Sequence, residues 1–233
     1  MATLYIVATP IGNLEDITLR ALNILKSVEV IACEDTRHTQ KLLSKYDIHK
    51  RLIATHAHNE LSSAQGIVGL LEQGLDVAFV SDAGTPSISD PGARLVTCVR
   101  DAGYTVVGIP GASAFSTLIS IAGNVGKTFT FEGFLPIKKG KRTKRLEVLI
   151  NRDESFIIYE SPYRVLKTLT EIKAIDSKRI VVVAREMTKI HEEIIRDSVE
   201  NVVENLGSRQ AIKGEFAICI CPKAASDRVE EEV

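Results

Sequence analysis

The sequence predicts an α/β protein of two domains, with a mostly parallel sheet in the first and a mixed sheet in the second. Short apolar runs alternate with amphipathic segments through the first half of the chain, a rhythm typical of parallel strands covered by helices on both faces. From about residue 123, strand-like runs follow one another with fewer helices between them, which favours a mixed sheet. The change falls at Gly123–Lys127, so we expect domains at residues 1–122 and 123–233.

The individual elements follow from the period of the apolar residues. In the first domain we expect strands at 4–8, 28–33, 52–55, 76–80 and 106–109, and helices near 19–25, 40–45, 63–73 and 93–101. Thr18 is suited to cap the first helix, and Gly74 and Gly103 are suited to end the last two. In the second domain we expect strands at 128–134, 156–159, 180–184, 192–196 and 216–221, and helices near 143–150, 164–172 and 198–206.

Two loops of small residues follow predicted strands of the first domain. The loop Ser81–Gly92 combines glycines and prolines with Asp82 and Asp90, and the second loop runs through Gly108–Ala114. A tight structural connection is the plain alternative for the first loop. Because ligands of open α/β sheets bind beyond the carboxyl ends of the strands, the two loops predict a small-molecule site. No GxGxxG follows the first strand and no GxxxxGK[ST] is present, which disfavours dinucleotide-binding and P-loop proteins.

Charge and composition exclude several classes of protein. The net charge is −1, so contact with a polyanion must come from a local patch rather than from the whole chain. No apolar run approaches the length of a membrane span and no secretory leader is evident, so we expect a cytoplasmic protein that does not bind membranes. The four cysteines form no CxxC pair and are expected to be buried hydrophobes. His56 and His58 lack a third ligand at local spacing, so we expect no metal site.

One short segment, residues 138–145, carries a local patch of positive charge. Six cations stand within eight residues, namely Lys138, Lys139, Lys141, Arg142, Lys144 and Arg145. A solvated loop is one interpretation of this run. The other, which we favour, is contact with the phosphates of a nucleic acid.

Many ordered motifs along the chain resemble the tetrapyrrole methylase superfamily, and within it the ribosomal RNA small subunit methyltransferase I family. The segments that carry the resemblance are Ala8–Leu14, Glu34–Arg37, His58–Glu60, Ser81–Pro86, Asp90–Gly92, Pro110–Ala114, Gly133–Pro136, Tyr159–Arg164 and Arg185–Glu186. They cover nearly the whole chain. Members that modify tetrapyrroles carry a GxGPGD-type first loop and a shorter second loop, and this chain departs from both patterns.

The resemblance implies two α/β domains with S-adenosylmethionine in the cleft between them, and a homodimer. It implies 2′-O-methylation of a cytidine in the decoding region of small-subunit ribosomal RNA, with free RNA or the assembled subunit as partner. The positions that match the cofactor site of the superfamily are Pro10, Asp82, Ala83, Gly84, Ile88, Ser113, Ala114, Glu160 and Met187.

The expected reaction is in-line attack of a ribose 2′-oxygen on the cofactor methyl, which depends on positioning and on acceptance of a proton. Glu186 or Asp35 is suited to accept the proton, and Arg37 or Lys189 to stabilise the developing oxyanion. Two alternative functions remain, methylation of a precorrin-type tetrapyrrole at carbon and RNA binding without catalysis. Methyl transfer from labelled cofactor separates RNA binding without catalysis from the two enzymes, and a comparison of isolated small subunits with a tetrapyrrole as substrate separates the two enzymes.

Overall fold

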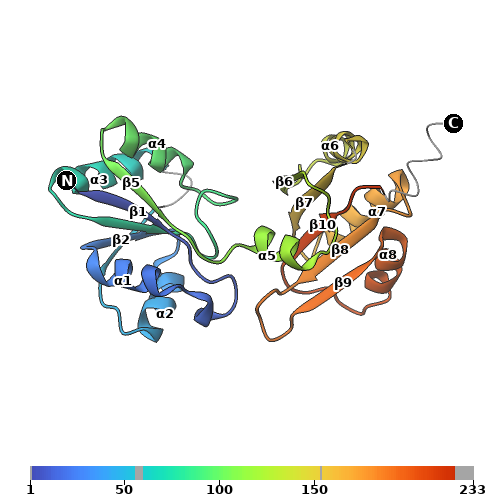
Figure 1. Ribbon diagram of the computed structural model, residues 1–233, viewed down its shortest axis with the longest axis horizontal. Helices are drawn as coiled ribbons and strands as arrows, with labels where there is room; N and C mark the ends of the chain where they lie inside the picture. Colours follow the sequence, from blue (N-terminus) through green and yellow to red (C-terminus); the bar gives the residue numbers. More distant parts are fainter. Residues whose placement is uncertain (1, 56–59, 153, 224–233) are drawn as a thin grey trace. The chain divides into compact units, whose positions relative to one another are not determined.

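The structure is a computed structural model that describes residues 2–55, 60–152 and 154–223. It divides into two compact units, Met1–Ser113 and Ala114–Val233 (Figure 1). Helix α5 (Ala114–Ile121) belongs to the second unit because it packs against strand β10 (Phe216–Ile220). The observed boundary, between Ser113 and Ala114, therefore lies one helix earlier in the chain than the boundary expected at residues 122/123. Both units are α/β, as the sequence predicted.

Unit 1 is built on a sheet of five parallel strands in the order β3-β2-β4-β1-β5. The strands are β1 (Thr3–Val7), β2 (Val30–Cys33), β3 (Arg51–Ala54), β4 (Val77–Val80) and β5 (Thr105–Ile109). The helices are α1 (Leu19–Ser27), α2 (Thr36–Lys45), α3 (Glu60–Glu72) and α4 (Ala93–Asp101), with a short 3₁₀ turn, η1 (Leu14–Asp16). Since all strands are parallel, their carboxyl ends share one edge of the sheet.

The central strands of unit 1 are buried on both faces. In β4, Ala78 and Val80 pack with α1 and α2, whereas Val77 and Phe79 pack with α3 and α4. This double burial explains why β4 is a continuous apolar run rather than an alternating one. The sheet is therefore a rigid support for the loops at its carboxyl edge.

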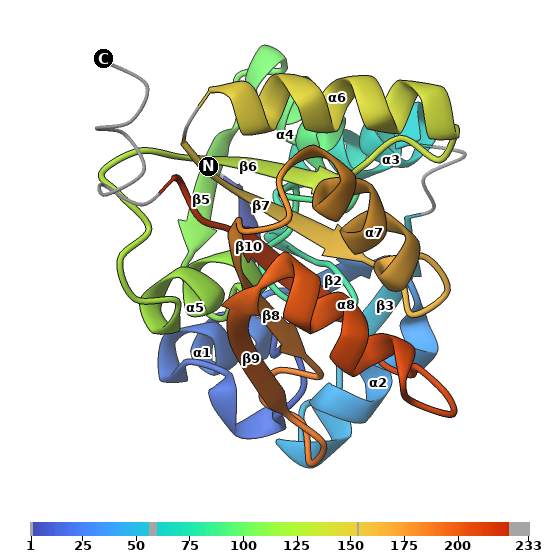
Figure 2. The same cartoon turned by 90° about the vertical axis from the view of Figure 1, so that its right-hand side faces the viewer.

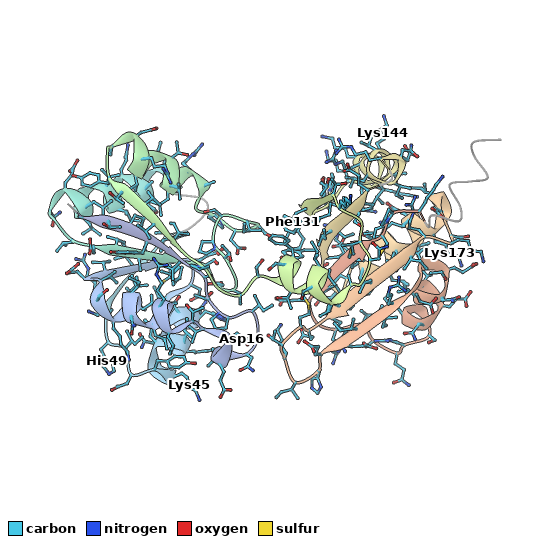
Figure 3. All side chains as sticks on the ribbon, viewed as in Figure 1. Asp16, Lys45, His49, Phe131, Lys144 and Lys173 are labelled. Carbon is cyan, nitrogen blue, oxygen red and sulfur yellow. The ribbon has the colours of Figure 1, made fainter. Side chains whose placement is uncertain are left out.

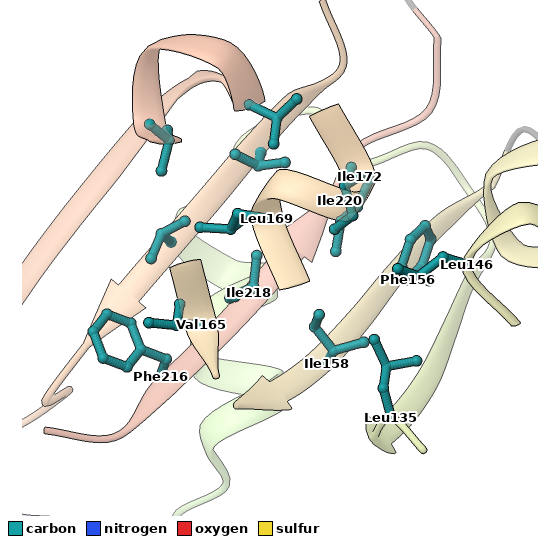
Figure 4. Packing of buried hydrophobic residues seen from close by; sticks show 14 of the residues in the cluster. Leu135, Leu146, Phe156, Ile158, Val165, Leu169, Ile172, Phe216, Ile218 and Ile220 are labelled. Carbon is teal, nitrogen blue, oxygen red and sulfur yellow. The ribbon is translucent and has the colours of Figure 1, made fainter. Parts of the chain in front are cut away.

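Unit 2 contains a mixed sheet in the order β6-β7-β10-β8-β9, in which only β6 and β7 are parallel. The other strands are β6 (Phe129–Phe134), β7 (Ser155–Glu160), β8 (Ile180–Arg185) and β9 (Glu193–Ser198). Helices α6 (Lys139–Asn151), α7 (Val165–Ile175) and α8 (Val199–Gly207) lie on one face of this sheet (Figure 2). Their shared core includes Leu146, Phe156, Leu169 and Ile218 (Figure 4).

The other face of the unit 2 sheet carries aromatic side chains. The rings of Phe115 in α5 and Phe131 in β6 are 5.0 Å apart, and Tyr159 contacts Phe131 edge-on at 5.1 Å. Phe134 also meets Tyr159 edge-on, at 5.9 Å. These contacts hold α5 and the two parallel strands together through ring packing.

Several elements differ from the sequence prediction, among them α2, which begins at Thr36 rather than at 40, and the turn η1, which was not predicted. Helix α5 was not predicted, and α6 begins at Lys139 rather than at 143, so the basic run forms the first two turns of a helix instead of a loop. Of the four cysteines, Cys33, Cys219 and Cys221 are buried, Cys98 is partly exposed, and none forms a disulfide. Within residues 2–55, 60–152 and 154–223, no helix is long and apolar enough to span a membrane.

Candidate active site

Three loops at the carboxyl edge of the unit 1 sheet are hydrogen-bonded to one another. Thr9, after β1, and Gly84, after β4, form a two-way backbone pair, with N···O distances of 2.9 and 3.0 Å. Thr85 Oγ1 donates to the carbonyl of Ala112, after β5, at 3.2 Å. The loops that were predicted separately are therefore one connected structure, and it contains Pro10 and Ser113.

Two glycines fix the course of the β4 loop. Gly84 is buried with φ of 77°, and a Cβ there would lie 3.3 Å from Ile11. Gly92 has φ of 137°, and a Cβ would come within 2.4 Å of the Ser87 Oγ. Both conformations favour glycine, so side chains at these positions would force the loop away from its neighbours.

Acidic residues gather in an open hollow beside these loops. The hollow is lined by Glu34, Asp35, Thr36, Arg37, Ala54 and Asp82. The N–H of Asp35 donates to Asp82 Oδ1 at 3.1 Å, which joins the loops after β2 and β4. The structure thus brings together three of the predicted site residues, Asp35, Arg37 and Asp82.

The Asp35 carboxylate is already engaged within its own turn. It caps α2 by accepting the Arg37 N–H at 2.8 Å, and the Arg37 guanidinium binds it at 2.9 and 3.2 Å. The hydrogen bond from the Arg37 side chain, followed by that from its backbone, lowers the pKa of Asp35 to about 2. A carboxylate of such low basicity is poorly matched to accept a proton at neutral pH.

The pKa of Asp90, in the same loop as Asp82, is shifted in the opposite direction from that of Asp35. Burial raises the pKa of its carboxyl, and the negative charge of Asp82 raises it further, against a hydrogen bond from Ser81. The Ser87 hydroxyl in this loop is buried and has no hydrogen-bond partner among the described residues. Ile88, next to it, is exposed. The loop therefore offers an unsatisfied polar atom and an exposed apolar side chain at the sheet edge.

In unit 2, the loop after β8 holds the other two predicted catalytic residues, Glu186 and Lys189. Two residues of this loop, Glu186 and Thr188, have positive φ values of 52° and 65°. Glu186 Oε1 accepts the Glu215 N–H and the Lys189 ammonium, both at 2.9 Å, and Lys189 also bonds Glu215 Oε2 at 2.9 Å. Strained backbone of this kind persists where surrounding contacts over-determine it and is concentrated at functional loops.

The pairing sets the acidity of both side chains. Burial alone would raise the pKa of Glu186, but the hydrogen bonds from Lys189 and the Glu215 N–H hold it below its ordinary value. Burial alone would lower the pKa of Lys189, but its two carboxylate partners raise it. The predicted base and the predicted cation therefore neutralise each other in this structure.

Two of the unit 2 positions predicted for the cofactor, Glu160 and Met187, are buried. Glu160 accepts hydrogen bonds from the Ser161 N–H at 2.9 Å and the Thr168 hydroxyl at 2.8 Å, and Arg164 lies 3.2 Å away. Its carboxylate thus fastens the exit of β7 to α7. Ala83 is exposed and Ala114 is partly exposed at the first residue of α5.

The predicted RNA-binding run requires a correction. Arg142 is 2% exposed and forms a bidentate pair with Glu171 at 2.6 and 2.9 Å, while also donating to the Ile137 carbonyl at 3.0 Å. Arg145 pairs with Glu132 at 2.7 Å. These two arginines, which were predicted to contact RNA, are instead paired with carboxylates of α7 and β6. Lys138, Lys139, Lys141 and Lys144 are exposed (Figure 3, Lys144), and none forms an ion pair with a described residue.

The histidines considered as metal ligands, His56 and His58, lie outside the described residues. Among the described residues, no three His, Cys, Asp or Glu side chains are grouped as a metal site would need. Thr9, Thr85 and Glu215 were not predicted as site residues, and their contacts connect segments 27 or more residues apart. Only the density of glycine and proline beside them signalled a structured loop.

Comparison with known proteins agrees with this fold. The family model described as Tetrapyrrole (Corrin/Porphyrin) Methylases matches residues 3–203. Among solved structures, a cobalt precorrin-4 methyltransferase superimposes with a TM-score of 0.70 at 17% identity, covering 93% of this chain and 94% of that one. A diphthine synthase superimposes with a TM-score of 0.73 at 12% identity, covering 96% and 91%. These likenesses establish the fold.

Curated sequences are much more similar. The Ribosomal RNA small subunit methyltransferase I of Pasteurella multocida (strain Pm70) is 48% identical over 229 residues, covering 97% of this chain and 82% of that protein. The protein of the same name from Bacillus subtilis (strain 168) is 44% identical over 232 residues, covering 100% and 79%. The chain therefore belongs to the ribosomal RNA small subunit methyltransferase I family, within the tetrapyrrole methylases.

Proposed function

We propose that this chain transfers a methyl group from S-adenosylmethionine to the 2′-oxygen of a cytidine in small-subunit ribosomal RNA. The observation that carries the proposal is the 44–48% identity, over nearly the whole chain, to proteins named Ribosomal RNA small subunit methyltransferase I. The exposed lysines of α6 support an RNA substrate. The similarity to the cobalt precorrin-4 methyltransferase, at 17% identity, supports the fold and not its substrate.

The loops of unit 1 have the chemistry that S-adenosylmethionine requires. The Ser87 hydroxyl is a buried polar atom without a partner among the described residues, and the exposed Ile88 offers an apolar surface for an adenine ring. We place the cofactor against Pro10, Asp82, Ala83, Gly84, Ile88 and Ser113 of the connected loops of unit 1. Ala114, Glu160 and Met187 of unit 2 are proposed as cofactor residues from the family resemblance alone. The Gly84 N–H is bonded to Thr9, so Gly84 serves by its shape and not as a donor.

The cofactor supplies an electrophilic methyl group on a sulfonium, and the chain must then position a ribose oxygen and accept its proton. Asp35 and Glu186 both have lowered pKa values, and each is tied to the cation proposed beside it. Arg37 is the more accessible cation, with 89% of its side chain exposed, and we assign it to the RNA backbone or the developing oxyanion. Asp90 combines a raised pKa with a place in the cofactor loop, and we add it to the candidate proton acceptors.

The test is methyl transfer from radiolabelled S-adenosylmethionine to isolated small ribosomal subunits, to protein-free small-subunit RNA and to a uroporphyrin-type tetrapyrrole. Alkaline hydrolysis identifies the position of the methyl group, because a 2′-O-methyl ribose cannot attack the neighbouring phosphodiester. We expect label in an alkali-resistant dinucleotide whose 5′ residue is a cytidine. Label in a base, in the tetrapyrrole, or in no substrate would refute the proposed reaction.

A further inference from the structure

Three large apolar side chains stand exposed at the ends of two neighbouring strands of unit 2. Tyr163 is 94% exposed in the loop after β7, Phe134 is 59% exposed at the last residue of β6, and Ile137 is 82% exposed in the loop that follows β6. Because β6 and β7 are parallel, the two loops leave the same edge of the sheet. Large apolar groups gathered on a surface in this way indicate a contact site for another molecule.

The two loops are fastened together from within. Arg164, next to Tyr163, donates to the Leu135 carbonyl at 3.0 Å and lies 3.2 Å from Glu160. Arg142 donates to the Ile137 carbonyl at 3.0 Å. The Tyr163 turn itself is closed by the Arg164 and Val165 N–H groups, which both donate to the Ser161 carbonyl at 3.0 Å. The ring is thus presented from an ordered turn, which lowers the entropic cost of a contact made by the ring.

The charges beside these rings select the kind of partner. Lys138 and Lys139 follow Ile137 directly, and Lys141 and Lys144 continue along α6, all exposed and none in an ion pair with a described residue. Such a set attracts a polyanion. The apolar stripe of α6, which includes Leu146 and Leu149, faces the core of unit 2, and Val148 is the one large hydrophobic side chain of this helix that is exposed. A single exposed valine is not the apolar face by which an amphipathic helix enters a membrane.

We propose that Tyr163, with Ile137 and Phe134 beside it, forms a stacking platform for unpaired bases of RNA whose phosphates run along the lysines of α6. The inference rests on the proposed function and adds that the substrate is held through a single-stranded segment. Aromatic rings stack on any unpaired base, whereas paired bases expose no face to them. Lysines supply the part of the affinity that depends on salt, and the ring supplies a part that does not.

The test measures the affinity of the full chain for a labelled 12-nucleotide RNA, single-stranded or annealed to its complement, by fluorescence anisotropy. Tyr163→Ala is expected to weaken single-strand binding about tenfold, with an unchanged salt slope and little effect on the duplex. Tyr163→Phe retains the ring and should bind like the wild type. Phe129→Ala, an exposed ring at the opposite end of β6, is the matched control and should also bind like the wild type.

Equal affinity of Tyr163→Ala and wild type for the single strand would overturn the inference, as would an equal loss for the duplex or an equal loss in Tyr163→Phe. Binding to phosphatidylserine vesicles that depends on Tyr163, with RNA binding unchanged, would also overturn it, since it would assign the patch to membranes. Methyl transfer is scored separately. RNA binding that depends on the ring, without methylation, would refute the proposed reaction and support the stacking platform. Methylation together with RNA binding that does not depend on the ring would support the reaction and refute the platform.

Discussion

Replacing Arg142 by alanine is expected to destabilise unit 2 by about 3 kcal/mol. The variant removes a buried guanidinium that makes two bonds to Glu171 and one to the Ile137 carbonyl. Breaking one side of a buried ion pair costs about 3–5 kcal/mol because the other charge stays buried and unpaired. The lower figure applies here, since the Glu171 side chain is 12% exposed and retains a 3.4 Å contact with the Thr143 hydroxyl.

Urea unfolding followed by circular dichroism measures this loss without adding salt. In a thermal scan, about 3 kcal/mol corresponds to a fall of roughly 6–12 °C in Tm for a chain of this size. Lys141→Ala, an exposed cation one position away, is the control and should change stability by no more than about 0.5 kcal/mol. The double variant Arg142→Met with Glu171→Leu removes both charges, and it should be more stable than Arg142→Ala.

The pH dependence provides a second reading of the same pair. The hydrogen bond from Arg142 lowers the pKa of Glu171, so the pair stabilises the fold above the ordinary carboxyl pKa and loses that effect as the pH falls through the lowered value. The stability gap between the wild type and Arg142→Ala should therefore shrink in acid. Equal unfolding of Arg142→Ala and Lys141→Ala at neutral pH would refute this account and return Arg142 to the RNA-binding set.

Four further outcomes are expected. Replacing the four exposed lysines of α6 and its cap by glutamine should reduce the salt slope of log affinity for RNA by about 3 units, at 0.7–0.9 per contact, and leave the affinity for S-adenosylhomocysteine unchanged. Asp82→Ala and Ser113→Tyr should each weaken S-adenosylhomocysteine binding in calorimetry. Unchanged affinity in both folded variants would show that the proposed location of the cofactor site is wrong. Asp35→Asn retains an N-cap residue and removes the carboxylate, so near-normal kcat would exclude Asp35 as the base, whereas a loss of 10²-fold or more, on the order of general-base effects, would support it. Asp90→Asn should raise Tm at neutral pH, because the raised pKa of Asp90 means that the fold disfavours its charged form; the gain should vanish below the ordinary carboxyl pKa of 3.8, and a gain that persists there would contradict the assignment.

Strands and most helices were predictable because their signals are local. The predicted bounds of α4, 93–101, match the structure, since Gly92 precedes it and Gly103 follows. Helix α5, with the sequence AFSTLISI, was missed because its serine, threonine and isoleucine residues are weak helix formers. Its packing against β10, about a hundred residues away, decides its conformation.

The basic run shows why part of the site was not predictable. Counted along the sequence, six cations in eight residues have no acid among them. The carboxylates that neutralise two of them come from Glu132, on the neighbouring strand, and from Glu171, 29 residues from Arg142. The expected helix start at 143 also left Arg142 outside the helix. In the structure the helix begins at Lys139, and Arg142 lies on its buried side.

The loops of unit 1 show the opposite case. Glycine and proline mark a constrained backbone wherever they stand, so the loop Ser81–Gly92 was predictable as a structured feature. Its bonds to Thr9 and Ala112 depend on the strand order, which places β1 between β4 and β5. Local composition therefore identifies the segment, and the topology identifies its partners.

The acidity of the candidate bases bears on how the reaction is driven. A general base is most effective when its pKa lies near the working pH, and both Asp35 and Glu186 are held below their ordinary values by a bonded cation. Each of these cations, Arg37 and Lys189, is also less available to an oxyanion while it is paired. In the proposed reaction, if binding of RNA leaves both pairs intact, the chain would contribute chiefly by placing the ribose oxygen, and the sulfonium would contribute the reactivity. If RNA draws Arg37 away through a phosphate, the pKa of Asp35 rises toward its ordinary value, and substrate binding itself makes the base more effective.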